Sequence, residues 1–419
     1  TGVLLLTGTD SVANYEQVLR TVTYQDTATD PNRITRTITV VAGETTNPSN
    51  TATTTVTFVP EAVALWLSTD DDVASPSGVN GLDSWSAGDV LEFGHPNLAV
   101  EPGTSGGTFY EAFSISDFSS DSSANVRAVH FVTAPVTIGS GANSIDLQVG
   151  DLLLSITGAE TLISNNTLAV TEDDVFIFRP DTIGAYSSGT FEILLEEPFG
   201  HRIHAMTLVE SDTTIGDTVV TAGTFLFTSG GHDNIVTYQA TGAGVGVTSG
   251  TSEVLIDGPD IGIGGRIEGL ELIEVTTGIG CVILNPGTLL ITLNADDGSV
   301  GDNGISVNEE DIFYLEVTET TLVAGTTVAD ATLLVEGADL AIGGENINAI
   351  SLTSNMPPVA IDDTASTDED TPVTTGDVLS NDLRSNNAII SAFDAVSANG
   401  GTVVNNGDGT FTYTPTLSL

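Results

Sequence analysis

The chain has 419 residues, of which 40% are hydrophobic and only 16% are charged, and its formal net charge is −49. This length predicts roughly two to four domains rather than one ordinary core. An acidic excess of this size repels phosphate, which argues against nucleic acid as a partner and against binding to or insertion into anionic membranes.

The composition predicts an all-β protein. Glycine is abundant, at 45 residues, and threonine, serine, asparagine and aspartate supply most of the turns between short apolar runs. No long window has helical periodicity, and residues 15–20 are the best candidate for a single helical turn. The lone Cys281 excludes an intrachain disulfide and is expected to be a small buried side chain. Since no initiator methionine, signal peptide or transmembrane run is present, we expect a processed chain or a piece of a larger one.

Residues 1–60 contain two alternating segments, TRTITVV and TATTTVTFV, which predict two strands joined by a Gly/Asn/Pro turn. Together with LTGTDSVANYEQVLRTVTY, these segments resemble the closing half of cadherin-like, immunoglobulin-type repeats in large bacterial surface proteins. The resemblance implies half of a β-sandwich, and the residue pattern itself predicts Tyr15 and Leu19 as core residues.

Residues 61–354 contain a four-fold repeat of short strands. LWLS, LLLS, FLFT and LLIT begin at positions 65, 152, 225 and 289, and similar strands follow each of them. Three copies begin with an additional strand (AVHFV, AMTLV, GLELI), whereas the first copy has none and a spare strand, NINAISLT, follows the fourth copy. This order predicts a four-bladed β-propeller whose C-terminal strand completes the first blade. It also resembles propeller-like repeats of large secreted bacterial proteins. Two packed β-sandwiches are the alternative.

Residues 355–419 contain PPVAIDDTASTDEDTPVTTGDVLSNDL and NGGTVVNNGDGTFTYTP. These segments resemble the opening half of tandem cadherin-like repeats, and NGDGT predicts a turn between two strands. In cadherin-like families, acidic pairs near domain junctions bind Ca²⁺, a hard cation that prefers oxygen ligands. The resemblance therefore implies a calcium site formed by Asp362, Asp363, Glu369, Asp370, Asn381 and Asp382. The sequence LRSNN replaces the acidic run that often follows the Asn-Asp pair, and solvated loop acids are the alternative.

Other polar residues favour structural roles. Asp89, Asp174 and Asp311 recur at one position of the repeat, with Asn234 in the remaining copy, which predicts a turn or cap. His201 and His204 are three residues apart, which on a strand places them on opposite faces and argues against a metal pair. Trp66 and Trp85 are expected in the core, with sugar stacking by Trp85 as the alternative.

No catalytic motif is present. The sequence therefore favours a non-enzymatic, extracellular structural protein of the bacterial surface. In this hypothesis the C-terminal half-domain of one copy completes the N-terminal half-domain of the next, giving a head-to-tail homopolymer. Pairing of the halves within one chain, or separate domains of one longer chain, are alternatives. A carbohydrate- or ligand-binding propeller of a giant secreted adhesin is the second function to consider.

Overall fold

The computed structural model describes residues 36–44, 47–56, 64–74, 80–82, 84–100, 103, 105–119, 124–229, 233–280, 282–340, 342, 344–353, 363–376, 378, 390, 393–397, 400–407 and 409–416. The chain divides into two compact units, Thr1–Val59 and Pro60–Leu419. The described structure is all-β: its helices are α2 (Thr321–Ala324) and three 3₁₀ turns, η1 (Ile115–Asp117), η2 (Gly258–Ile261) and η3 (Gly337–Leu340). No helix in this part of the chain is long and apolar enough to cross a membrane.

Four sheets dominate the described part of the second unit, and their antiparallel strands are short, apolar and rich in β-branched and aromatic residues. Sheet 1 contains β31 (Ile347–Thr353), β3 (Ala64–Thr69), β7 (Asp89–Ala99), β8 (Gly106–Ser114) and the parallel edge strand β5 (Asn80–Gly81). Sheet 2 contains β9 (Val126–Phe131), β12 (Leu152–Ile156), β15 (Val175–Thr182) and β16 (Ala185–Leu195). Sheet 3 contains β17 (Ile203–Leu208), β20 (Thr224–Ser229), β21 (Ile235–Gly242) and β22 (Ser249–Ile256). Sheet 4 contains β23 (Ile267–Leu272), β26 (Leu289–Leu293), β29 (Ile312–Glu319) and β30 (Val328–Val335).

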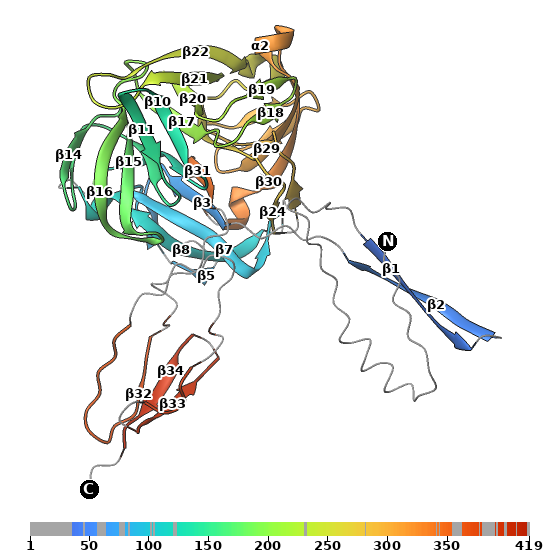
Figure 1. Ribbon diagram of the computed structural model, residues 1–419, viewed down its shortest axis with the longest axis vertical. Coiled ribbons are helices and arrows are strands. Elements are labelled where there is room, and N and C mark those ends of the chain that lie inside the picture. Colours follow the sequence, from blue (N-terminus) through green and yellow to red (C-terminus); the bar gives the residue numbers. More distant parts are fainter. Residues whose placement is uncertain are drawn as a thin grey trace. The chain divides into compact units, whose positions relative to one another are not determined.

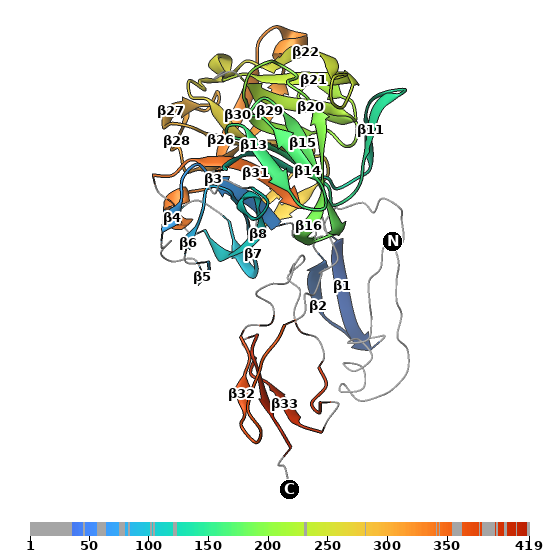
Figure 2. The same cartoon turned by 90° about the vertical axis from the view of Figure 1, so that its left-hand side faces the viewer.

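The last strand of the repeat region pairs with its first. β31 is antiparallel to β3, and the register runs from Ala64 opposite Thr353 to Thr69 opposite Ile347. Figures 1 and 2 both show β31 alongside β3, although nearly the whole repeat separates them in sequence. The spare strand NINAISLT therefore occupies the position that the sequence predicted for it.

The four sheets are neighbours in a cycle. Their first strands touch in the order β31, β9, β17, β23 and back to β31, and the diagonal pairs β9/β23 and β17/β31 also touch. We call the line that these four strands surround the axis. A hydrophobic cluster fills each space between neighbouring sheets: Trp66 packs with Phe131 between sheets 1 and 2, and Leu67 with Leu290 between sheets 1 and 4. The other two clusters contain Phe227 between sheets 2 and 3 and Phe313 between sheets 3 and 4.

Small hairpins inserted between the main strands make the four copies unequal. Three lie between the first and second strands of a sheet: β10 (Val136–Ser140) with β11 (Asn143–Leu147), β18 (Thr213–Ile215) with β19 (Thr218–Val220), and β24 (Thr277–Ile279) with β25 (Val282–Leu284). Three lie between the second and third strands: β4 (Val73–Ala74) with β6 (Ser84–Trp85), β13 (Glu160–Ile163) with β14 (Thr167–Val170), and β27 (Asp297–Val300) with β28 (Ile305–Val307). Gly287 follows one of them with a φ of +90°, and a Cβ there would lie 2.2 Å from the Thr214 oxygen. Only glycine fits this return to the second strand.

The flanking segments also contain the predicted strands. In the first unit, β1 (Arg36–Glu44) pairs with β2 (Asn47–Val56), and Glu44 faces Asn47 at the turn. In the C-terminal segment, β34 (Phe411–Thr414) lies between β32 (Val373–Thr374) and β33 (Thr402–Asn405). The predicted turn joins β33 to β34, since Asn406 N–H donates to the Thr410 carbonyl at 3.0 Å. Residues 15–20 and Cys281 lie outside the described residues.

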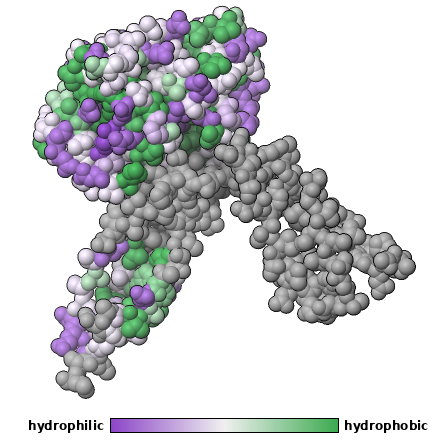
Figure 3. All heavy atoms as spheres, viewed as in Figure 1, coloured by the Kyte–Doolittle hydropathy of each residue, from purple (hydrophilic) through white to green (hydrophobic). Residues whose placement is uncertain are grey.

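Hydrophilic and hydrophobic residues are interspersed over the visible face of the repeat region (Figure 3). Exposed apolar side chains include Val219, which is 63% exposed, and Val323 of α2, also 63% exposed. Scattered residues of this kind are normal at a protein surface and need no partner to explain them.

Candidate functional site

The same irregularity occurs in the first strand of all four main sheets. The register between the first and second strands skips one residue, which is the mark of a β-bulge. The skipped residues are Arg127 in β9, His204 in β17, Glu268 in β23 and Asn348 in β31. A bulge re-aims the side chains around it, and here it lets residues three positions apart both face the axis.

Polar side chains therefore lie along the axis in layers, and the residues of one layer come from different sheets. We define the first axial layer as the four skipped residues, of which Arg127, His204 and Glu268 contact one another. We define the second axial layer as the residues three positions further along each strand, His130, Thr207, Glu271 and Ser351, of which the first three contact one another. The third axial layer contains Thr133, Glu210 and Glu274. Apart from Arg127, Thr133 and Glu274, these residues are less than 9% exposed, so most of the network is buried.

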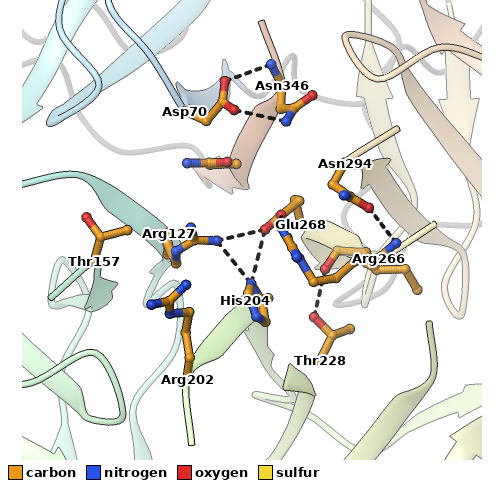
Figure 4. Close-up of polar contacts among 12 residues, drawn as sticks. Asp70, Arg127, Thr157, Arg202, His204, Thr228, Arg266, Glu268, Asn294 and Asn346 are labelled. Atoms are coloured by element: carbon orange, nitrogen blue, oxygen red, sulfur yellow. Dashed lines mark hydrogen bonds and ion pairs between the residues drawn. The ribbon is translucent and has the colours of Figure 1, made fainter. Parts of the chain in front are cut away.

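Glu268 is the centre of the first axial layer (Figure 4). Its Oε2 lies 3.2 Å from Arg127 Nη1, and its Oε1 accepts a hydrogen bond from Arg266 Nε at 2.8 Å. Burial alone would raise the pKa of Glu268, but hydrogen bonds from His204 and Arg266 and the charges of Arg266 and Arg127 outweigh burial and lower it. Glu268 therefore stays ionised inside the protein.

His204 lies between Arg127 and Glu268 in the same layer. Its Nδ1 is 3.0 Å from Arg127 Nη1 and 3.4 Å from Glu268 Oε2. Burial lowers the pKa of His204, and the charges of Arg266 and Arg127 lower it further, against the opposing effect of Glu268. The ring of His204 is therefore neutral at neutral pH.

His130 has the opposite character in the second axial layer. Its Nε2 lies 3.3 Å from Glu210 Oε1, and its Nδ1 lies 3.1 Å from Thr207 Oγ1, which donates to Glu271 Oε2 at 3.2 Å. Burial lowers the pKa of His130, but the hydrogen bonds and charges of Glu210 and Glu271 outweigh burial and raise it to about 10. His130 is therefore a buried imidazolium at neutral pH.

Carboxylates dominate the third axial layer. Glu210 Oε1 accepts a hydrogen bond from Thr133 N–H at 2.6 Å, and Glu274 Oε1 accepts from Glu210 N–H at 2.9 Å and from Ser211 N–H at 2.8 Å. Burial raises the pKa of Glu274, and the hydrogen bonds from the two backbone N–H groups partly offset this rise. Charge therefore changes along the axis, from arginines before and within the first layer to glutamates in the third.

The sequence contains a signal for this network that the prediction missed. Polar residues recur at a spacing of three in RAVHFVT, HAMTLVE and EGLELIE, and again in NAISLT. Regular strand alternation has a period of two, so the spacing of three between His201 and His204 predicts that they lie on opposite faces. That argument fails for His204, because a bulge occurs there, and it does not apply to His201, which precedes β17 and is exposed against Phe199.

The predicted calcium ligands are only partly described. Asp363, Glu369 and Asp370 are exposed, whereas Asp362, Asn381 and Asp382 lie outside the described residues. Within the described ranges, no group of three or more His, Cys, Asp or Glu side chains is placed to hold a metal ion. The calcium site stays a prediction.

The recurring acids are caps, as predicted. Asp89 Oδ2 accepts a hydrogen bond from Ser86 N–H at 2.8 Å, and Asp174 and Asp311 accept the equivalent bonds from Thr171 and Asn308 at 2.8 Å. Asn234 Oδ1 instead accepts from Gly258 N–H at 3.0 Å. Each of these side chains lies at the start of a third strand and accepts a hydrogen bond from a backbone N–H group.

Both tryptophans are buried, as expected for core residues. Trp66 is 0% exposed and donates from Nε1 to Glu92 Oε2 at 3.2 Å. Trp85 is 5% exposed, packs against Phe109 and donates to Thr69 Oγ1 at 3.0 Å. Burial of Trp85 rules out the alternative that it is an exposed sugar-stacking platform.

Comparison with known families identifies one domain. Residues 355–418 match the family model of the bacterial Ig domain, whereas no match was found among curated proteins or solved structures. Such domains are typical of surface-exposed, adhesin-type proteins. The matched segment is the one whose sequence resembles tandem bacterial surface repeats, and the resemblance of residues 1–60 stays a prediction.

Proposed function

We propose that residues 64–353 form a four-bladed β-propeller that serves as a non-enzymatic binding module of an adhesin-type surface protein. The observation that carries the proposal is the cycle of sheets, in which β31 from the end of the repeat completes sheet 1 and a hydrophobic cluster separates every neighbouring pair. Propellers bury their sheet edges in this way, and the loops at the two ends of the axis remain available for ligands. The bacterial Ig domain supports display at a cell surface.

The axial network supports a structural role for the buried ionisable groups. Glu268 is engaged by Arg127 and Arg266, and His130 by Glu210 and Glu271. Buried charges that satisfy one another hold strands in register, whereas a catalytic site needs groups directed at a substrate. This favours binding over catalysis.

A glycan array and an adhesion assay with the full chain test this function. We expect binding to surface-derived ligands that is retained after prolonged incubation with no chemical change in the ligand. Chemical conversion of a bound ligand would show that the protein is an enzyme. If the chain bound none of the glycans and cell surfaces tested, that result would contradict an adhesive role.

We propose head-to-tail self-association through the Ig-like segments as a second function. The specific observation is the apolar exposure of the C-terminal segment, where Phe393 is 45%, Val396 59% and Val404 54% exposed. Such side chains and the edges of a small sheet are suited to completion by strands of another copy. Filaments in negative-stain images, lost on addition of a chelator, would support a calcium-dependent polymer. Monodisperse monomers at high concentration with and without Ca²⁺ would contradict it.

A further inference from the structure

Positive charge is concentrated at one end of the axis. The chain has eight basic residues against 57 acidic ones, yet Arg127, Arg202 and Arg266 lie together around the first axial layer (Figure 4). They come from three different sheets: Arg127 from β9, Arg202 from the residue before β17 and Arg266 from the residue before β23. We call these three residues the basic cluster.

The nearby carboxylates do not cancel the basic cluster. Glu268 faces Arg127 and Arg266, and Glu172 Oε2 accepts from Arg202 Nε at 2.8 Å, which leaves three guanidinium groups against two carboxylates. His204 is neutral because burial and the neighbouring arginines lower its pKa. On the side of sheet 1, Asp70 is a third carboxylate; burial and Asp71 raise its pKa, and its two oxygens accept hydrogen bonds from Asn346 at 2.9 Å.

Guanidinium N–H groups of the basic cluster are available to donate hydrogen bonds to a ligand. Arg127 Nε is buried without a hydrogen-bond partner, and an unsatisfied buried donor is costly. The Arg202 and Arg266 side chains are 42% and 29% exposed, so a ligand can approach them from solvent. Planar guanidinium groups from separate strands match the bidentate geometry of carboxylates and sulfates.

Internal charge balance does not account for Arg202. Arg127 and Arg266 compensate the buried Glu268. Among the residues that the structure describes, the ion pair of Arg202 is with Glu172, whose side chain is 35% exposed, so both groups could be solvated separately at little cost. Burial is the largest effect on the pKa of Arg127 and lowers it, and the charge of Arg202 lowers it further, so these two guanidinium groups repel each other in the absence of an anion. The position is explained if an anion is bound there.

We propose that the basic cluster binds the carboxylate or sulfate group of an acidic ligand, with Arg202 and Arg266 as its contact residues and Arg127 at its base. The proposal names the ligand chemistry of the binding module and so rests on the proposed function. An acidic sugar such as a uronic acid carries this group on a surface glycan.

Isothermal titration of the full chain with sodium glucuronate, sodium sulfate and glucose at constant ionic strength tests the site. We expect saturable binding of glucuronate or sulfate and none of glucose. R202Q should weaken anion binding about tenfold, and R202Q/R266Q should abolish it, since each removes charge-assisted hydrogen bonds. R202K, which keeps the charge but loses the bidentate fork, should lie between R202Q and the parent chain.

R179Q is the matched control. Arg179 is 32% exposed and bound to Asp151 in sheet 2, so the substitution changes the net charge equally outside the basic cluster. Equal weakening by R179Q, or no saturable anion binding by the parent chain, would overturn the proposal. If the chain binds neutral glycans on the array but no anion, the anion site fails while the adhesive function stands. If nothing binds in either assay, both fail.

Discussion

Glu268 is the carboxylate on which the first axial layer depends. It is 1% exposed and pairs with two arginines, Arg127 from sheet 2 and Arg266 from sheet 4. A buried ion pair contributes little net stability compared with apolar packing, but removing one partner leaves an uncompensated charge in a medium of low dielectric constant. The layer is therefore more sensitive to the loss of one member than to replacement of the whole set.

E268Q should lower the free energy of unfolding by about 3 kcal/mol, because Arg127 and Arg266 would be left without a counter-charge. Urea unfolding at pH 7 measures the change. E253Q is the control, since Glu253 is exposed on β22 and its loss should change stability by less than about 0.5 kcal/mol. Equal stability of the two variants would contradict the role of Glu268.

The buried imidazolium of His130 should make stability depend on pH in the alkaline range. Its pKa is raised from 6.5 to about 10 in the folded protein, so its stabilising contribution is fully present below pH 6.5 and is lost as the pH rises towards 10. The stability difference between the parent chain and H130Q should therefore shrink between pH 6.5 and pH 10.

Denaturant unfolding at several pH values measures this difference. H201Q is the control, since His201 is exposed and stacked on Phe199, and it should show a much smaller dependence. A difference between the parent chain and H130Q that is constant over the range would show that His130 is neutral in the folded protein.

At the scale of elements, the sequence predicts the main strands and their order well. LWLS, LLLS, FLFT and LLIT correspond to β3, β12, β20 and β26, and the spare strand corresponds to β31. Short apolar runs bounded by glycine and asparagine predict strands locally. The first copy lacks the strand with which the other three begin, and the number of strands per copy shows this without knowledge of any contact.

Features that depend on the meeting of distant strands could not be predicted in this way. The bulges at Arg127 and His204 shift side chains by one position relative to a neighbouring strand. The spacing of three between polar residues accompanies them, but by itself it does not say that these residues meet. The inserted hairpins are only two to five residues per strand, too short for a periodicity. The axial network was missed because it exists only where four strands converge.

β31 should be essential to the repeat region as a whole. Ile350 is 1% exposed, pairs with Leu67 of β3 and packs close to Gly269 of β23, so it joins sheets 1 and 4. I350A should destabilise the protein by about 2–5 kcal/mol through lost burial and a residual cavity. V219A at an exposed site is the control in the same urea titration, and equal stability of both variants would contradict closure by β31.

At the scale of the whole molecule, a net charge of −49 opposes compactness. Added salt should therefore raise the melting temperature, since the Debye length falls from about 30 Å at 0.01 M to about 3 Å at 1 M ionic strength. Calorimetry in NaCl, and in MgCl₂ and CaCl₂ at matched ionic strength, measures this effect.

A melting temperature that falls with NaCl would contradict self-repulsion as the dominant effect. Stabilisation by CaCl₂ beyond that by MgCl₂ would support the calcium site predicted at Asp362, Asp363, Glu369, Asp370, Asn381 and Asp382. Equal effects of the two salts would favour solvated loop acids there.

The bulge shared by the four main sheets has a consequence for how this chain can diverge. Each bulge fixes where a strand presents its axial side chains but not which side chains they are, as Arg127, His204, Glu268 and Asn348 show. A substitution at one of these positions changes the charge and hydrogen-bond partners of residues in the same layer, which belong to other sheets, rather than those of its neighbours in sequence. Related chains should therefore co-vary across copies of the repeat, and copies exchanged by recombination should be accepted only when they complete the charge pattern of each layer.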